Sequence, residues 1–151
     1  VETAREMHAE ALKRWPESHA AILSAAVADY RPAEAATEKI KKSQDSFSIQ
    51  LVKNPDIAAD MGKQKANGQI LAGFALETHD AETQALQKLE RKNFDFIVLN
   101  TLADPGAGFH YDTNKVSIFF RDNKRKDFQL KSKQEVAGDI LDALAGILAR
   151  R

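Results

Sequence analysis

The chain has 151 residues, and its 22 lysines and arginines are balanced by 22 aspartates and glutamates, so its formal net charge is zero. That length suits one globular domain with a buried core, and a hydrophobic fraction of 43% argues against intrinsic disorder. The charge balance argues against bulk electrostatic binding of nucleic acid or of an anionic membrane. No apolar stretch approaches the roughly 18 residues of a membrane span. Because cysteine is absent, disulfides, zinc–thiolate sites and a thiol nucleophile are excluded.

The N-terminal third of the chain predicts a helix, a strand and a loop. Thr3-Ala-Arg-Glu6 has the pattern of a capping box, and apolar residues at helical spacing continue until Pro16 stops the helix. Ala20–Val27 is a continuous run of small and apolar residues, which is typical of a strand covered on both faces. Residues 33–45 lack periodicity and carry several lysines, so we expect an exposed loop there.

The middle of the chain predicts two more buried strands with helices beside them. Residues 47–52 alternate as a strand does, and Asn54-Pro55 predicts a helix with Asn54 as its cap and Pro55 as its first residue. Ile70–Ala75 and Phe94–Leu99 are apolar runs that predict buried strands. Asp80 stands where it could cap a helix that runs to about residue 91.

The C-terminal third predicts a β-hairpin and a closing helix. Val116–Phe120 and Phe128–Leu130 are its expected strands, and Asp122-Asn123 is the expected turn. Apolar residues repeat at helical spacing from Val136 to Ile147. This order of elements predicts an α/β fold, a Rossmann-like three-layer sandwich whose sheet is mostly parallel and ends in the hairpin and helix.

Polar side chains follow the predicted strands at their carboxyl ends, where open α/β sheets bind ligands. After the first strand, small residues around Ala25 would let a flat ligand approach the backbone, and Asp29 could hold a divalent cation or a ribose hydroxyl. An ion pair between Asp29 and Arg31 is an equally good interpretation. Asn54–Ile57 places a helix N-terminus, which attracts phosphates, although ordinary capping needs no ligand.

Two groups of lysines are candidates for binding a polyphosphate. Lys39, Lys41 and Lys42 lie in the predicted loop, which could close over a nucleotide, although a solvated basic loop is the commoner outcome. Lys88 and Lys92 are four residues apart on a predicted helix, where a polyphosphate would offset their mutual repulsion. The alternative is that Lys88 and Lys92 are two exposed lysines screened by acidic neighbours and bind no ligand. The four histidines lack metal-ligand spacing, and the glycine fingerprints of the P-loop and of dinucleotide-binding folds are absent.

Five segments, taken together, resemble phosphopantothenoylcysteine synthetase in both order and spacing. They are Ala25–Pro32, Lys39–Ser43, Lys53–Ile57, Gly73–Thr78 and Arg91–Asn100. In many bacteria this enzyme is the C-terminal half of a bifunctional coenzyme A biosynthesis protein. Family members also carry a glycine-rich strand and an Ile-Thr-Asn-Ser-Ser-Gly-type segment that supplies an asparagine for the acyl-cytidylate step. Nothing in residues 1–151 matches that segment, so we expect a single ligase domain truncated at its N-terminus.

The resemblance implies a phosphopantothenate–cysteine ligase that depends on CTP, although family members differ in using CTP or ATP. In the family, the carboxylate of 4′-phosphopantothenate attacks the α-phosphate of CTP and pyrophosphate leaves, after which the amine of L-cysteine displaces CMP. The resemblance further implies Mg²⁺ with the nucleotide, FMN only in a separate decarboxylase half, a cytoplasmic location and a homodimer. The hairpin Val116–Leu130 is the expected place of pairing. A non-catalytic nucleotide-binding module that regulates a partner is the alternative function, and an NAD(P)H-binding oxidoreductase domain is disfavoured.

The family's functional residues can be carried over position by position. Ala25 matches the backbone segment that reads the cytosine, and Asp29 matches the acidic residue beside the nucleotide and its metal ion. Lys39 matches a lid lysine that contacts the triphosphate and assists turnover, so it is the expected catalytic residue, with Lys41 and Lys42 in support. The remaining matches are expected to contact the nucleotide: Asn54, Pro55, Asp56, Ile57, Phe74, Lys88 and Lys92.

Overall fold

The computed structural model describes residues 1–34, 38, 46–77, 80–101 and 111–150. Its body is built on a five-stranded sheet in the order β1 (Ala20–Leu23), β4 (Ile70–Glu77), β5 (Phe96–Thr101), β7 (Val116–Phe120) and β8 (Arg125–Asp127). The strands β1, β4 and β5 are parallel, and β7 and β8 add to them in antiparallel pairs. The predicted α/β class, with a parallel core and a C-terminal hairpin, is therefore confirmed.

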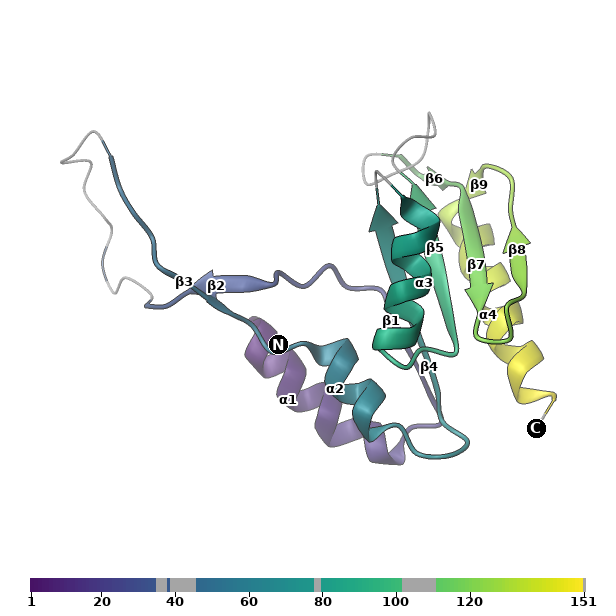
Figure 1. Cartoon of the computed structure of the whole chain (residues 1–151), viewed down its shortest axis with the longest axis horizontal. Coiled ribbons are helices and arrows are strands. Elements are labelled where there is room, and N and C mark those ends of the chain that lie inside the picture. The colour runs from purple at the N-terminus through teal and green to yellow at the C-terminus, as the bar shows by residue number, and fades with distance from the viewer. Residues whose placement is uncertain (35–37, 39–45, 78–79, 102–110, 151) are drawn as a thin grey trace.

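Helices cover both faces of this sheet, which gives three layers (Figure 1). On one face lie α1 (Ala4–Arg14), the short 3-10 helix η1 (Trp15–Glu17), α2 (Ile57–Gln64) and α3 (Ala81–Arg91), and on the other lies α4 (Lys133–Leu148). Because successive strand residues point to opposite faces, β4 and β5 supply both cores. Leu71 and Ile97 pack under α1–α3, whereas Ile70 and Phe96 pack under α4.

A two-stranded ribbon projects from the body (Figure 1). Its strands are β2 (Tyr30–Pro32) and β3 (Leu51–Lys53), which are antiparallel, with Arg31 opposite Val52. A second small sheet pairs β6 (Thr113–Asn114) with β9 (Lys131–Ser132) just before α4. In the part of the chain that the structure describes, no helix has the length and apolar character needed to cross a membrane.

The capping box at the N-terminus is confirmed, because Thr3 accepts a hydrogen bond from the amide of Glu6 and the Glu6 carboxylate accepts one from the amide of Thr3. The buried strands at 70–75 and 94–99 are also confirmed, with bounds shifted to β4 and β5. Asp80 occupies the N-cap position of α3 without a side-chain hydrogen bond to the helix. The closing helix begins earlier than its apolar repeat indicates, because a second capping box joins Ser132 and Glu135.

The first strand is shorter and more exposed than predicted. β1 ends at Leu23, its four residues are only half-buried, and residues 24–28 are irregular and exposed. β1 is an edge strand of the described sheet and pairs only with β4, so neither full burial nor a long ladder is available to it. The prediction of a strand covered on both faces over Ala20–Val27 was wrong.

Two other boundaries also differ from the prediction. The strand predicted over 47–52 is limited to β3, because only Leu51–Lys53 has a backbone partner in β2. The second hairpin strand is Arg125–Asp127 and not Phe128–Leu130. The turn explains this difference, because Asn123 adopts a left-handed φ of 61° and the amide of Phe120 donates to the carbonyl of Lys124, which brings β8 back immediately.

Candidate functional site

A cavity of about 620 Å³ lies where β1, the ribbon and α2 meet. Its wall is formed by the segment that leaves the carboxyl end of β1, by residues 53–58, by the middle of β4 and by the turn after α3. The carboxyl ends of parallel strands are the usual ligand-binding edge of an open α/β sheet. The cavity therefore lies on the edge of the sheet where the sequence predicts a site.

Asn54 joins the two chain segments at the base of the ribbon. Its amide Nδ2 donates to the carbonyl of Ala28 at 2.8 Å, and its backbone amide donates to the carbonyl of Asp29 at 2.8 Å. Arg31 completes the junction, since its guanidinium donates to the carbonyl of Lys53 at 2.5 Å and to Oδ1 of Asn54 at 3.2 Å. These bonds hold residues 28–31 against residues 53–54 and shape one side of the cavity.

These contacts correct two predictions. Asn54 does not cap α2, because its side chain is engaged with Ala28; the N-cap is Asp56, whose Oδ1 accepts from the amide of Ala59 at 3.0 Å. Pro55 therefore precedes the helix and is not its first residue. The alternative ion pair between Asp29 and Arg31 is not formed either, because Arg31 takes its partners from residues 53–54.

Lys92 brings a positive charge into the cavity wall. It follows the end of α3, its side chain is only 13% exposed, and its ammonium group is paired with the Asp56 carboxylate. Burial lowers the pKa of Lys92 below its ordinary value, and the negative charge of Asp29 acts in the opposite direction. The wall thus holds one partly desolvated ammonium group close to two carboxylates.

Phe74 and its neighbour Gly73 form the part of the wall that belongs to β4. Position 73 requires glycine because the buried Phe94 ring lies close to the backbone of β4 there. A Cβ atom on Gly73 would lie 2.4 Å from Cζ of that ring. The Phe94 ring therefore packs directly against the strand beneath the cavity. Phe74 is half-buried on the opposite face, against the core under α4.

The structure gathers most of the predicted nucleotide-contacting residues into this one wall. They are Ala25, Asp29, Asn54, Pro55, Asp56, Ile57, Phe74 and Lys92. Lys88 lies outside the wall, and its ammonium group is 2.6 Å from Oε1 of Glu77, so Lys88 and Lys92 are paired with different carboxylates. Lys39, Lys41 and Lys42 lie outside the described residues.

Sequence reasoning missed several residues of the wall, among them Met7, Tyr30 and Lys53. Lys53 is the first residue of the Lys53–Ile57 segment, so its place beside Asn54 is the signal that could have revealed it. Met7 belongs to α1, and nothing local in the sequence links the first helix to the end of β1. Their roles depend on the tertiary arrangement.

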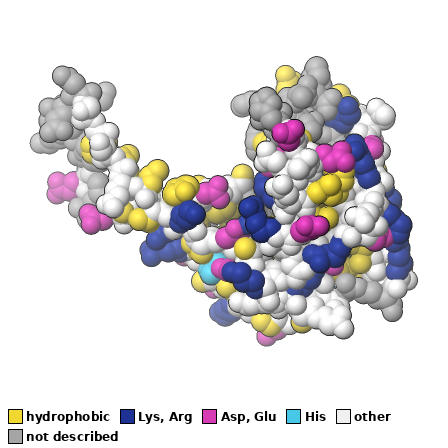
Figure 2. Space-filling view, viewed as in Figure 1, with side chains coloured by type: hydrophobic (Ala, Val, Ile, Leu, Met, Phe, Trp, Pro, Cys, Tyr) yellow, Lys and Arg dark blue, Asp and Glu magenta, His cyan; other side chains and the backbone are white. Residues whose placement is uncertain are grey.

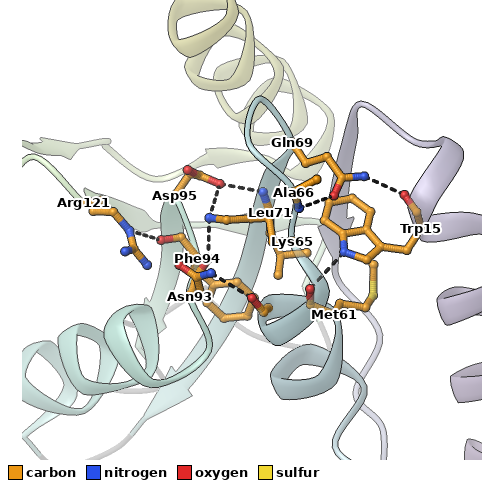
Figure 3. A network of polar contacts seen from close by, with 11 residues as sticks. Trp15, Met61, Lys65, Ala66, Gln69, Leu71, Asn93, Phe94, Asp95 and Arg121 are labelled. Atoms are coloured by element: carbon orange, nitrogen blue, oxygen red, sulfur yellow. Dashed lines mark hydrogen bonds and ion pairs between the residues drawn. The ribbon is translucent and has the colours of Figure 1, made fainter.

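A polar network at the opposite ends of the strands holds α2 and η1 against the sheet (Figure 3). Gln69, which sequence reasoning also missed, donates to the carbonyls of Trp15 and Ser18 at 2.7 and 2.8 Å and accepts from the amide of Ala66. The indole Nε1 of Trp15 donates to the carbonyl of Met61 at 2.9 Å. This network fixes α2, and with it one side of the cavity.

Comparison with known protein families identifies the family of this chain. Residues 1–148 match the family model described as the DNA/pantothenate metabolism flavoprotein C-terminal domain. The chain belongs to this family. The match extends over every helix and strand described above, including both the ribbon and the cavity.

Named relatives of this flavoprotein C-terminal domain are longer proteins. A protein named cysteine/cysteine sulfinic acid decarboxylase, from an unknown prokaryotic organism, is 48% identical over 141 residues, which cover 93% of this chain and 39% of the relative. The coenzyme A biosynthesis bifunctional protein CoaBC of Haemophilus influenzae is 42% identical over 144 residues, which cover 95% of this chain and 36% of the relative. The chain therefore spans well under half the length of these relatives.

Solved structures agree with this assignment. A crystal structure of the C-terminal domain of CoaBC matches with a TM-score of 0.79 and 33% identity, covering 100% of this chain and 67% of that one. A DNA/pantothenate metabolism flavoprotein from Streptococcus pneumoniae shares the fold, with a TM-score of 0.77 at 20% identity over 97% of this chain and 71% of that one. The chain is homologous to the C-terminal domain of CoaBC.

Proposed function

We propose that this domain is a phosphopantothenate–cysteine ligase that activates 4′-phosphopantothenate with CTP. One observation carries the proposal: a single cavity wall contains Lys92, the start of α2 and the exposed Asp29. An ammonium group and a helix N-terminus are suited to phosphates, and a carboxylate is suited to the metal ion that accompanies them. The proteins named CoaBC, whose name assigns them to coenzyme A biosynthesis, supply the chemical context.

The dimensions and composition of the cavity support a nucleotide as its ligand. Its volume of about 620 Å³ falls within the range of roughly 300–1,000 Å³ that is usual for small-molecule sites. The exposed segment around Ala25 carries small side chains, so the flat ring of a base could approach its backbone. We place the base there, and the phosphates between Lys92 and the first turn of α2.

Asp29 is the residue that we propose as the magnesium ligand. No group of three or more histidine, aspartate or glutamate side chains suited to a metal ion occurs within the described ranges. Mg²⁺ in nucleotide sites is commonly bound through one or two carboxylates together with the phosphates themselves. One exposed carboxylate in the wall fits an ion that enters with the nucleotide, and such an ion would offset phosphate charge.

The proposed reaction has two steps. In the first, a carboxylate oxygen of 4′-phosphopantothenate bonds to the α-phosphorus of CTP, the bond to the β-phosphate oxygen breaks, and pyrophosphate leaves. In the second, the amine of L-cysteine bonds to the acyl carbon, the acyl–oxygen bond breaks, CMP leaves and the nitrogen loses a proton. Lys92 would stabilise charge on the phosphates, and we assign the catalytic contact with the triphosphate to Lys39.

We further propose that the chain forms a homodimer through its ribbon. Tyr30, Phe47, Ile49 and Leu51 are all more than half exposed, and hydrophobic side chains lie along the projecting ribbon (Figure 2). A two-stranded ribbon is marginally stable alone, and a second copy related by a two-fold axis could add strands and cover these side chains. The β8 edge of the expected hairpin is a poorer surface, because its three residues are exposed and charged, which disfavours strand pairing.

Calorimetric titration of the chain with CTP and Mg²⁺ tests the proposed function. We expect saturable binding, and absence of heat at millimolar nucleotide would contradict the proposal. The catalytic assignment is tested separately by Lys39→Gln in a full-length parent protein, where turnover should fall while the fold is retained. If the unmodified full-length parent bound CTP but showed no turnover, a non-catalytic nucleotide-binding module would be favoured.

A further inference from the structure

We infer that Gly62, which lies outside the cavity wall, is a positioning residue that determines the position of the Lys92 ammonium group. The inference rests on the proposed function, in which Lys92 binds the phosphates of the nucleotide. Gly62 is buried in the last turn of α2, whereas Lys92 follows the last turn of α3. The two helices meet at this point, and three observations connect Gly62 with Lys92.

The first observation is a direct backbone contact. A Cβ atom on Gly62 would lie 2.0 Å from the carbonyl oxygen of Lys92 and 2.8 Å from its carbonyl carbon. Real side chains essentially never approach a backbone this closely, so any residue other than glycine must displace the end of α3 or the last turn of α2. The absence of a side chain at Gly62 therefore determines how closely the Lys92 backbone approaches α2.

The second observation is a set of hydrogen bonds around the same contact. Asn93, which adopts a left-handed φ of 55°, donates from Nδ2 to the carbonyl of Gly62 at 2.8 Å. Lys65, one turn after Gly62, donates from Nζ to the carbonyl of Asn93 at 2.7 Å and to Oδ2 of Asp95 at 3.0 Å (Figure 3). Because that Asp95 oxygen also accepts from the amide of Leu71, the turn is held by both α2 and β4.

The third observation concerns the other end of α2. Asp56, the N-cap, pairs with the ammonium group of Lys92, and it precedes Gly62 by six residues, or about 9 Å at 1.5 Å per residue. α2 thus holds Lys92 twice, by its backbone at the last turn and by its ammonium group at the first. The side chain of Lys92 runs between these points toward the cavity, so a displacement at Gly62 would move the charge that meets the phosphates.

The test is a double-mutant cycle that measures the dissociation constant of CTP with Mg²⁺. We expect Gly62→Ala to weaken binding about tenfold in the otherwise unchanged chain and less than about twofold in a Lys92→Met background. A purely structural loss would weaken binding by the same factor in both backgrounds, and that result would overturn the inference, as would unchanged binding by Gly62→Ala. Gly138→Ala is the matched control, because Gly138 is also helical and a Cβ there would meet no atom within 4 Å beyond its chain neighbours and the backbone of its own helix.

A second variant keeps the test decisive if Gly62→Ala fails to fold. Asn93→Gly removes the hydrogen bond to Gly62 while glycine tolerates the left-handed φ, and its loss of CTP affinity should likewise disappear in the Lys92→Met background. Equal losses in both backgrounds would again overturn the inference. Failure of the unmodified chain to bind CTP would overturn the proposed function as well, so the two failures are distinguishable.

Discussion

The ammonium group of Lys92 is paired with Asp56, and the same Asp56 carboxylate caps α2 through the amide of Ala59. One side chain thus links the end of α3 to the start of α2 at the cavity wall. Because a lysine ammonium group has three donors, Lys92 can bind a phosphate while it remains paired with Asp56. This relationship makes Lys92 a better candidate for phosphate binding than its position in the sequence alone indicates.

Lys92→Met should weaken the binding of CTP with Mg²⁺ by about 10- to 100-fold, because a hydrogen bond to a charged group contributes roughly 1.5–3 kcal/mol. Lys88→Met is the matched control, since Lys88 lies in the last turn of α3, which Lys92 follows, but is paired with Glu77 outside the cavity wall. We expect Lys88→Met to change the affinity less than about threefold. Calorimetry measures both constants, and equal losses would show that the two lysines contribute alike.

Asn54→Ala should loosen the base of the ribbon. The variant loses the hydrogen bonds to Ala28 and Arg31, each with a net contribution of about 1 kcal/mol. We expect CTP affinity to fall about five- to tenfold, because residues 28–31 carry part of the cavity wall. Asn67→Ala, in the exposed turn before β4, is the control and should bind as the unmodified chain does. A normal affinity of Asn54→Ala would contradict a role of this junction in shaping the site.

Gln69→Ala should destabilise the fold by about 2–3 kcal/mol, because it leaves the buried carbonyl of Trp15 and the amide of Ala66 without this partner. The free energy of unfolding in urea provides the measurement. Gln87→Ala, on the exposed face of α3, should stay within about 0.5 kcal/mol of the unmodified chain. A similar small effect for Gln69→Ala would mean that the network in Figure 3 contributes little to stability.

Asp60 should make a pH-dependent contribution to stability. Hydrogen bonds from Lys63 at 2.9 Å and His8 at 3.0 Å hold the pKa of Asp60 below its ordinary value of 3.8. A lowered folded-state pKa stabilises the fold above pH 3.8, and this contribution is lost as the pH falls through the folded-state pKa. Asp60→Asn should therefore lower the free energy of unfolding at pH 6 by less than about 1 kcal/mol, with the difference shrinking toward pH 3. Urea titrations of Asp60→Asn and the unmodified chain at pH 6 and pH 3 measure this difference. A difference that does not change with pH would contradict a lowered pKa for Asp60.

Charge on the ribbon should separate the proposed dimer. Leu51→Lys places an ammonium group on a strand residue that is 56% exposed and that a second copy would cover. We expect light scattering to report a monomer for this variant and a dimer for the unmodified chain. Lys126→Glu, on the exposed β8 edge, provides the comparison and should leave the dimer intact. The opposite pattern would place pairing at the hairpin.

Local patterns predicted the elements whose causes are local. The Thr3–Glu6 capping box and the apolar runs that became β4 and β5 depend on residues within a few positions of each other, so the sequence sufficed for them. The predicted boundaries of β1 and α2 were wrong for a common reason. Whether residues 24–28 extend a strand depends on a neighbour in space, and whether Asn54 caps a helix depends on the competing carbonyl of Ala28, which is 26 residues away.

The same division applies to the candidate site. Residue order and composition were enough to establish the fold class, the zero net charge, the absence of cysteine and the motif order that indicated the family. The packing of the helices and strands was needed to show that Lys92 enters the cavity wall while Lys88 does not, and that Met7 belongs to the wall. Helical spacing places the two lysines on one face, but each ammonium group moves toward the carboxylate that packing brings within reach, Glu77 for one and Asp56 for the other.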